Sequence, residues 1–223
     1  MPTFFYKISS TLFSILNILL DFLFPKEKIE TEIENMSAKE ILERGNTDVV
    51  LAKARISSIT SIFSYKDPFV KKLIEIVKYK GNKKVIDNCG EIIYKEIIKT
   101  KHKNLILIPI PSSNKRRREK GFNQTELLCE SILKNNPELF DYQKNILIKT
   151  KHRISQTKLK RKDRLDNLKN SMEIKNSESE ELIKNREIIL IDDVWTTGAT
   201  TSEAVRVLEE AGVKSVYIYT LAH

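Results

Sequence analysis

The sequence predicts an α/β fold in which a parallel β-sheet is flanked by helices, with an α-helical appendage at the N-terminus. Apolar runs of strand length alternate with segments of helical periodicity over the second half of the chain. Two of these runs are continuously apolar, as is typical of parallel strands covered on both faces. Polar loops follow both runs, and ligands of parallel sheets bind at such strand ends.

The expected strands and helices follow from this periodicity. Strands are predicted near residues 105–110, 146–149, 188–192 and 215–221, after a β-rich segment at 57–65. Helices are predicted near residues 73–80, 85–99, 122–134 and 200–211.

The chain divides into an N-terminal appendage, residues 1–60, and a main domain, residues 61–223. Residues 4–24 are strongly apolar, but their polar residues fall at helical steps of three and four. An amphipathic helix is therefore predicted. Its polar face would be formed by Ser10, Ser14, Asn17 and Asp21. A charged linker and a short helix that begins with a capping box at Ser37 should complete the appendage.

No transmembrane segment is expected in the appendage. Asp21 would be costly in lipid, and no small-residue cleavage site of a signal peptide is apparent. The apolar stripe of the helix instead favours packing on the domain or on a second copy, so a homo-oligomer is an open expectation.

The composition is that of a globular protein with an excess of basic residues. Hydrophobic residues make up 40% of the chain and charged residues 31%, with a net charge of +9. The two cysteines, Cys89 and Cys129, lie far apart in helical patterns. Two thiolates cannot build a four-thiolate zinc site, so no zinc is expected, and cytoplasm is the default location.

The most informative segment joins a strand, two carboxylates, a small polar loop and a helix. The apolar run Ile188–Ile191 leads into Asp192 and Asp193, and Gly212 ends the helix. Backbone amides at a helix start favour a phosphate, and adjacent carboxylates can accept hydrogen bonds from a diol. This combination suits a ribose 5-phosphate group. The expected phosphate-binding residues are Thr196, Thr197, Gly198, Ala199 and Thr200.

This segment resembles the phosphoribosyl diphosphate (PRPP) binding motif of type I phosphoribosyltransferases. Strand, acidic pair and a Thr-Thr-Gly-x-Thr loop occur in the motif's order. Trp195 departs from it, because most members have an aliphatic residue there. A plain strand–turn–helix with a solvated Asp-Asp turn is the alternative.

Three further segments narrow the resemblance. A Pro-x-Pro turn begins at Pro109 and is followed by a basic stretch and by Gly-Phe-Asn-Gln at 121–124. A Gln-x-x-Leu segment begins at Gln156, and a helical segment ends as Lys-Tyr-Lys-Gly at 78–81. In this order the motifs resemble the competence protein F (ComF) family of type I phosphoribosyltransferase-like proteins. The two cysteines cannot supply the zinc ribbon that many members carry.

The resemblance implies a PRPP-binding protein that holds or transfers a ribose 5-phosphate group with Mg²⁺. Asp192 and Asp193 would be the catalytic residues. The pyrophosphate loop and its basic flank would comprise Pro111, Ser112, Ser113, Lys115, Arg116, Arg118 and Lys120. A loop that closes as a lid would contain Gln156, Arg164 and Asn167. No metal ligand is assigned to a protein side chain, because Mg²⁺ binds mainly through substrate phosphates and waters.

Three functions stay open. The first is a phosphoribosyltransferase (a pentosyl glycosyltransferase), whose acceptor no motif identifies. The second is a non-catalytic module that senses PRPP or binds single-stranded DNA through the basic runs 115–120 and 149–164. For both readings the resemblance implies a link to DNA uptake during natural competence, with single-stranded DNA and helicase-type proteins as expected partners. The third is an assembly protein that uses the N-terminal helix.

Overall fold

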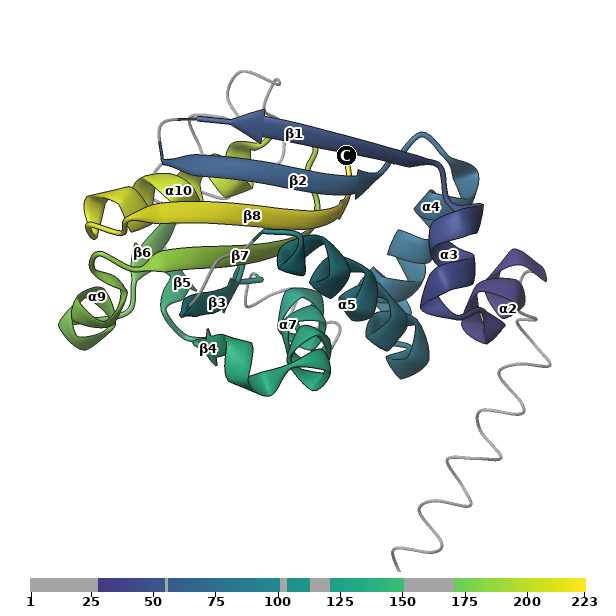
Figure 1. The fold of residues 1–223 in the computed structure, drawn as a ribbon, viewed down its shortest axis with the longest axis horizontal. Helices are drawn as coiled ribbons and strands as arrows, with labels where there is room; N and C mark the ends of the chain where they lie inside the picture. Colours follow the sequence, from purple (N-terminus) through teal and green to yellow (C-terminus); the bar gives the residue numbers. More distant parts are fainter. Residues whose placement is uncertain (1–27, 55, 101–103, 113–120, 151–170) are drawn as a thin grey trace, which may run out of the picture.

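A computed structural model gives the fold and describes residues 28–54, 56–100, 104–112, 121–150 and 171–223. Its centre is a six-stranded sheet with the strand order β1-β2-β8-β7-β3-β4 (Figure 1). All neighbouring strands pair in parallel except β1 and β2. The predicted α/β class with a mostly parallel sheet is therefore confirmed.

The six strands are β1 (Thr47–Lys53), β2 (Ser57–Phe63), β3 (Leu105–Pro109), β4 (Phe140–Tyr142), β7 (Glu187–Val194) and β8 (Ser215–Ala222). A separate antiparallel pair consists of β5 (Leu147–Lys149) and β6 (Met172–Ile174). The helices are α2 (Lys28–Asn35), α3 (Ala38–Arg44), α4 (Pro68–Glu75), the π-helix η1 (Ile76–Lys80), α5 (Lys83–Ile98), α7 (Gln124–Asn135), the 3-10 turn η2 (Pro137–Leu139), α9 (Ser177–Ile183) and α10 (Ala199–Glu210).

Two hydrophobic cores lie on the two faces of the sheet. Side chains of a strand alternate between faces, so Ile189 and Ile191 of β7 join the core with α4, α5 and α7. Ile188 and Leu190 join the core with α9 and α10. The sheet is thus covered on both sides, which explains why its central strands have no polar face.

The N-terminal part of the described chain packs on this domain. Ile33 of α2 and Ile41 of α3 are fully buried in the first core, and Ser37 forms the predicted capping box with Glu40. The predicted domain boundary after residue 60 falls inside β2, which pairs with β8. The amphipathic helix predicted for residues 4–24 lies outside the described residues. Within the described ranges, no helix is long and apolar enough to cross a membrane.

The sheet differs from the sequence-based expectation at its edge. The strand predicted near 146–149 is β5, which pairs with β6 in an antiparallel arrangement and does not join the main sheet. The edge position beside β3 belongs to β4, for which no strand was predicted. Both strands have only three residues, too few for periodicity to indicate their partners.

Helices α5 and α7 approach closely at Gly90. A Cβ atom at this position would lie 2.1 Å from the Ser131 Oγ atom and 2.5 Å from the Ser131 Cβ atom. The Ser131 hydroxyl donates a hydrogen bond to the carbonyl of Asp87 in α5, at 3.2 Å. The close approach holds α7, whose first residues reach the sheet, against α5.

We predict that Gly90→Ala destabilises the protein although alanine favours helices. Overpacking against Ser131 should cost about 1–3 kcal/mol of unfolding free energy. Urea unfolding should show a partial recovery in the double variant Gly90→Ala/Ser131→Gly, relative to each single change. Strictly additive losses would show that the two positions do not share this contact.

Candidate functional site at the carboxyl edge of the sheet

The two predicted carboxylates, Asp192 and Asp193, lie near the end of β7, at the carboxyl edge of the sheet. The neighbouring strand β3 leads there into Pro111 and Ser112, and the amide of Ile110 donates to the carbonyl of Ile191 at 2.9 Å. The structure therefore brings together the acidic pair and the first two residues of the predicted pyrophosphate loop.

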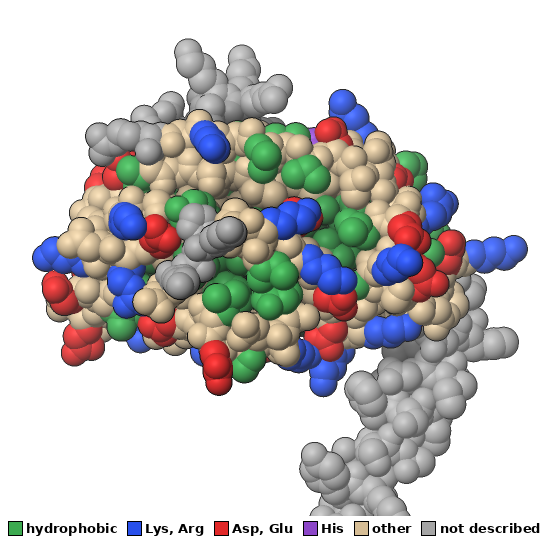
Figure 2. Space-filling model, viewed as in Figure 1, with side chains coloured by type: hydrophobic (Ala, Val, Ile, Leu, Met, Phe, Trp, Pro, Cys, Tyr) green, Lys and Arg blue, Asp and Glu red, His purple; other side chains and the backbone are tan. Residues whose placement is uncertain are grey.

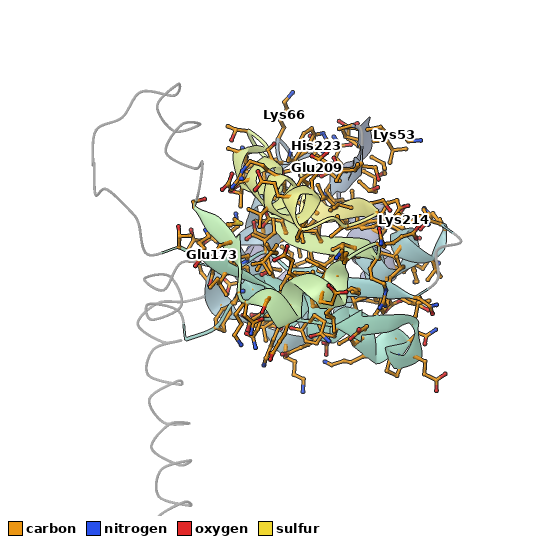
Figure 3. The ribbon with its side chains drawn as sticks, turned by 90° about the vertical axis from the view of Figure 1, so that its left-hand side faces the viewer. Lys53, Lys66, Glu173, Glu209, Lys214 and His223 are labelled. Carbon is orange, nitrogen blue, oxygen red and sulfur yellow. The ribbon has the colours of Figure 1, made fainter. Side chains whose placement is uncertain are left out.

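The ends of β2 and β8 complete this edge. The amide of Trp195 donates to the carbonyl of Ala222, and the amide of Tyr65 donates to the carbonyl of His223, both at 2.8 Å. Lys66 and His223 accordingly lie close together in Figure 3. The acidic pair Asp192 and Asp193, called the dyad below, thus lies among the ends of several parallel strands, as the sequence predicts.

Strand alternation directs the two carboxylates to opposite faces. Asp193 has the parity of Ile191, faces α7 and η1, and is only 6% exposed. Asp192 has the opposite parity and is partly buried, and the positive charge of Lys149 in β5 acts on it. The two acids therefore have different environments and are not equivalent.

Both oxygens of Asp193 have protein partners. The Lys78 Nζ atom lies 3.4 Å from Oδ1, and the Gln124 Nε2 atom donates to Oδ2 at 2.9 Å. Neither Lys78 nor Gln124 was predicted as a site residue, although both lie in the two motifs that indicate the family. The presence of both residues in these motifs was the sequence signal that could have identified them as site residues.

Lys78 reaches the site from a π-helical turn. Helix α4 begins with Asp67 as its N-cap and continues into η1, which Gly81 ends in the left-handed conformation (φ +60°). The predicted helix with a glycine cap is confirmed, but its last turn is π-helical, a feature often found at functional sites. A Cβ atom on Gly81 would lie 2.9 Å from the Phe122 ring, so the two motifs contact one another here.

Gln124 is positioned by the start of α7. Asn123 caps this helix by accepting from the amide of Thr125. The Thr125 hydroxyl donates to the carbonyl of Ile110 at 2.6 Å, just after β3. The beginning of α7 is therefore tied to the carboxyl edge, within reach of Asp193.

The predicted phosphate loop connects β7 to α10. Gly198 adopts the left-handed conformation (φ +72°), and its carbonyl accepts from the amide of Ser202 at 2.7 Å and from the Thr201 hydroxyl at 2.9 Å. Thr196 and Thr197 are exposed. The first amides of a helix have no acceptor within the helix, so the start of α10 offers donors to an anion.

Many of the predicted site residues lie outside the described residues. They are Ser113 of the predicted pyrophosphate loop, Lys115, Arg116, Arg118 and Lys120 of its basic flank, and Gln156, Arg164 and Asn167 of the predicted lid. On the face shown in Figure 2, basic and acidic side chains of the described residues are interspersed.

The chain is similar to several known proteins in sequence and fold. A family model for the phosphoribosyl transferase domain matches residues 145–223, which include β7, the dyad and α10. Competence protein F from Haemophilus influenzae is 35% identical over 118 residues, which is 52% of this chain and 49% of that protein. Competence protein ComFC from Bacillus subtilis is 33% identical over 165 residues, which is 72% of this chain and 62% of that protein.

The chain belongs to the competence protein F family. It spans about half the length of the Haemophilus influenzae relative and less than two thirds of the Bacillus subtilis one. Among solved structures, glutamine phosphoribosylpyrophosphate (PRPP) amidotransferase from Bacillus subtilis is similar at a TM-score of 0.44 and 13% identity. The match covers 66% of this chain and 30% of that chain.

The described residues of this ComF-family chain offer few ligands for a metal ion. They contain no group of three or more His, Cys, Asp or Glu side chains that could hold one. Cys89 and Cys129 are buried in α5 and α7, and burial raises the pKa of both thiols, to about 12 for Cys89. Metal-binding thiolates are thus disfavoured at both positions.

Asp192 is the perturbed acid of the dyad. Burial first, and then the charge of Asp193, raise the pKa of Asp192 from its ordinary value of 3.8 to about 7. The amide of Asp193, which donates to Asp192 Oδ1 at 2.9 Å, and the charges of Lys78 and Lys149 oppose this shift. A buried carboxyl group whose pKa is raised in this way is a candidate for a functional role.

We predict that Asp192→Asn changes how stability depends on pH. The pKa of Asp192 is higher in the folded than in the unfolded chain. The wild type therefore gains stability at low pH and loses this gain as the pH rises from about 4 to about 7. Urea midpoints measured across this range should fall more steeply for the wild type than for the variant. Parallel profiles would contradict the assigned pKa.

We predict that Gly198→Ala disturbs the packing of the loop between β7 and α10. In Gly198→Ala the left-handed φ is strained, and the new Cβ would lie 2.8 Å from the Trp195 Nε1 atom. Gly212→Ala is the matched control, because its φ is +78° but its nearest atom, Lys184 Cγ, is 3.8 Å away. Both should lose about 1–2 kcal/mol of stability through φ strain. Only Gly198→Ala should shift the emission of Trp195, the single tryptophan; equal spectra would contradict this packing.

Proposed function

We propose that this ComF-family protein binds PRPP at the carboxyl edge of its sheet and transfers the ribose 5-phosphate group to an acceptor. The observation that carries the proposal is the placement of Asp192 near the end of β7, six residues before Gly198, the left-handed N-cap of the 12-residue helix α10. A carboxylate for hydroxyl groups and a helix start for a phosphate thus lie within one short segment.

Each part of this segment has a separate task. The first amides of α10 would bind the 5-phosphate, whose charge the positive end of the helix dipole favours. Asp192 would accept a hydrogen bond from a ribose hydroxyl. Asp193, whose oxygens are held by Lys78 and Gln124, would keep the surrounding elements in place.

The diphosphate would leave toward the end of β3. Displacement at the anomeric carbon has oxocarbenium character, as in glycoside cleavage, so stabilising the departing charge is the main catalytic requirement. The backbone after β3 at Pro111 and Ser112 and the partly exposed ammonium of Lys78 are suited to that task. Mg²⁺ would be held mainly by the diphosphate oxygens and by waters, and would neutralise the leaving group.

A non-catalytic role in DNA uptake is the second candidate. It is favoured by the net charge of +9 and by the basic runs 115–120 and 149–164, most of which lie outside the described residues. Phosphate contacts would make single-stranded DNA binding steeply dependent on salt. Helicase-type partners belong to this candidate as well. Diphosphate release that depends on PRPP would separate the transferase from this alternative.

Calorimetric titration with PRPP and Mg²⁺ tests the proposal. Wild-type protein should bind, and Asp192→Asn should weaken binding about tenfold or more, because hydrogen bonds to charged groups contribute about 1.5–3 kcal/mol. Asp87→Asn is the control, since Asp87 pairs with Lys134 on the surface between α5 and α7. This variant should bind as the wild type does.

Folded wild-type protein that does not bind PRPP would refute the proposal. Equal losses in Asp192→Asn and Asp87→Asn would show that the dyad is not the binding site.

A further inference from the structure

Gln124 has a hydrogen-bond acceptor beside the dyad that no described residue uses. Its side chain is 6% exposed, and its Nε2 atom donates to Asp193 Oδ2. The Oε1 atom is buried and accepts no hydrogen bond from any residue that the structure describes. The proposed transfer reaction assigns no role to the Oε1 atom of Gln124.

The orientation of the amide is determined by Asp193. An ionised carboxylate only accepts hydrogen bonds, so the NH₂ group of Gln124 must face it. A flipped amide would place two oxygens against each other. Lys78 holds the other carboxylate oxygen, and the capped start of α7 limits movement of the backbone. Oε1 therefore stays next to the dyad.

A buried acceptor without a donor is costly and selective. Such groups are rare in folded proteins, and each costs about 1–3 kcal/mol. A fully ionised phosphate or diphosphate cannot satisfy Oε1, because it offers no proton. A sugar hydroxyl can satisfy it, because it donates one hydrogen bond and also accepts.

We propose that Gln124 binds a hydroxyl group of the ribose ring, with Oε1 as the acceptor. This inference rests on the proposed function, since it places a sugar phosphate between the start of α10 and the dyad. Asp192 and Gln124 then accept from the ring hydroxyls, and Asp193 positions Gln124. The site consequently selects ribose phosphates over deoxyribose phosphates.

The test compares three probes: ribose 5-phosphate, 2-deoxyribose 5-phosphate and 3-deoxyribose 5-phosphate. Calorimetry on the wild type should show that removing one of the two hydroxyls weakens binding about tenfold or more, as for sites that hydrogen-bond a substrate hydroxyl. Gln124→Met keeps the length of the side chain and removes the acceptor. In this variant the preference for ribose should shrink at least about threefold.

Lys78→Met is the matched control. It also removes one partner of Asp193 but leaves Gln124 Oε1 in place. It should weaken binding of all three phosphates, since a positive charge is lost, and should keep the wild-type ratio between ribose and deoxyribose probes. The ratio is the decisive readout, because a purely structural loss would lower all affinities together.

Several outcomes would overturn the inference. If the ratio of ribose to deoxyribose affinity is unchanged in Gln124→Met, Gln124 only positions Asp193. The same conclusion follows if this ratio falls equally in Gln124→Met and Lys78→Met. The ratio of ribose to deoxyribose affinity in the wild type is a test that no folding defect of a variant can affect. A wild type that binds PRPP but does not prefer the ribose probe over the deoxyribose probes retains the proposed function and refutes the role of Gln124. A wild type that does not bind PRPP refutes the proposed function, and the inference with it.

Discussion

The rest of the site depends on the two interactions that the buried carboxylate of Asp193 makes. This carboxylate joins the π-helical turn η1, the start of α7 and the end of β7 through one ion pair and one hydrogen bond. Because the carboxylate is buried, losing either partner would leave an unsatisfied group, which is far more costly than a lost surface pair. The dyad therefore has one member that holds the site together.

This arrangement leaves Asp192 as the member with the perturbed pKa. The two-residue repeat of the strand turns it toward the opposite face, where burial and the charge of Asp193 raise its pKa. Two adjacent carboxylates thus differ because of their surroundings, as in other sites where paired acids have separate roles. The loop after β7 then leads to the start of α10, a few residues after the two acids.

Close contacts at glycines connect the family motifs. Gly81 packs on the ring of Phe122, which brings the Lys-Tyr-Lys-Gly segment against the Gly-Phe-Asn-Gln segment. Gly198 packs on the indole of Trp195 and is the left-handed N-cap of α10. A larger side chain at Gly81 would push against Phe122, so these two motifs lie together although they are far apart in sequence.

The sequence by itself determined the α/β class, the strand–dyad–loop–helix segment and the main helices, because these depend on local periodicity, caps and turn residues. Only the tertiary structure decided that β4 takes the sheet edge, that β5 pairs with β6, and that Lys78 and Gln124 meet Asp193. Gln124 lies 69 residues from Asp193. Contacts at such separation depend on how whole elements pack, which no local pattern encodes.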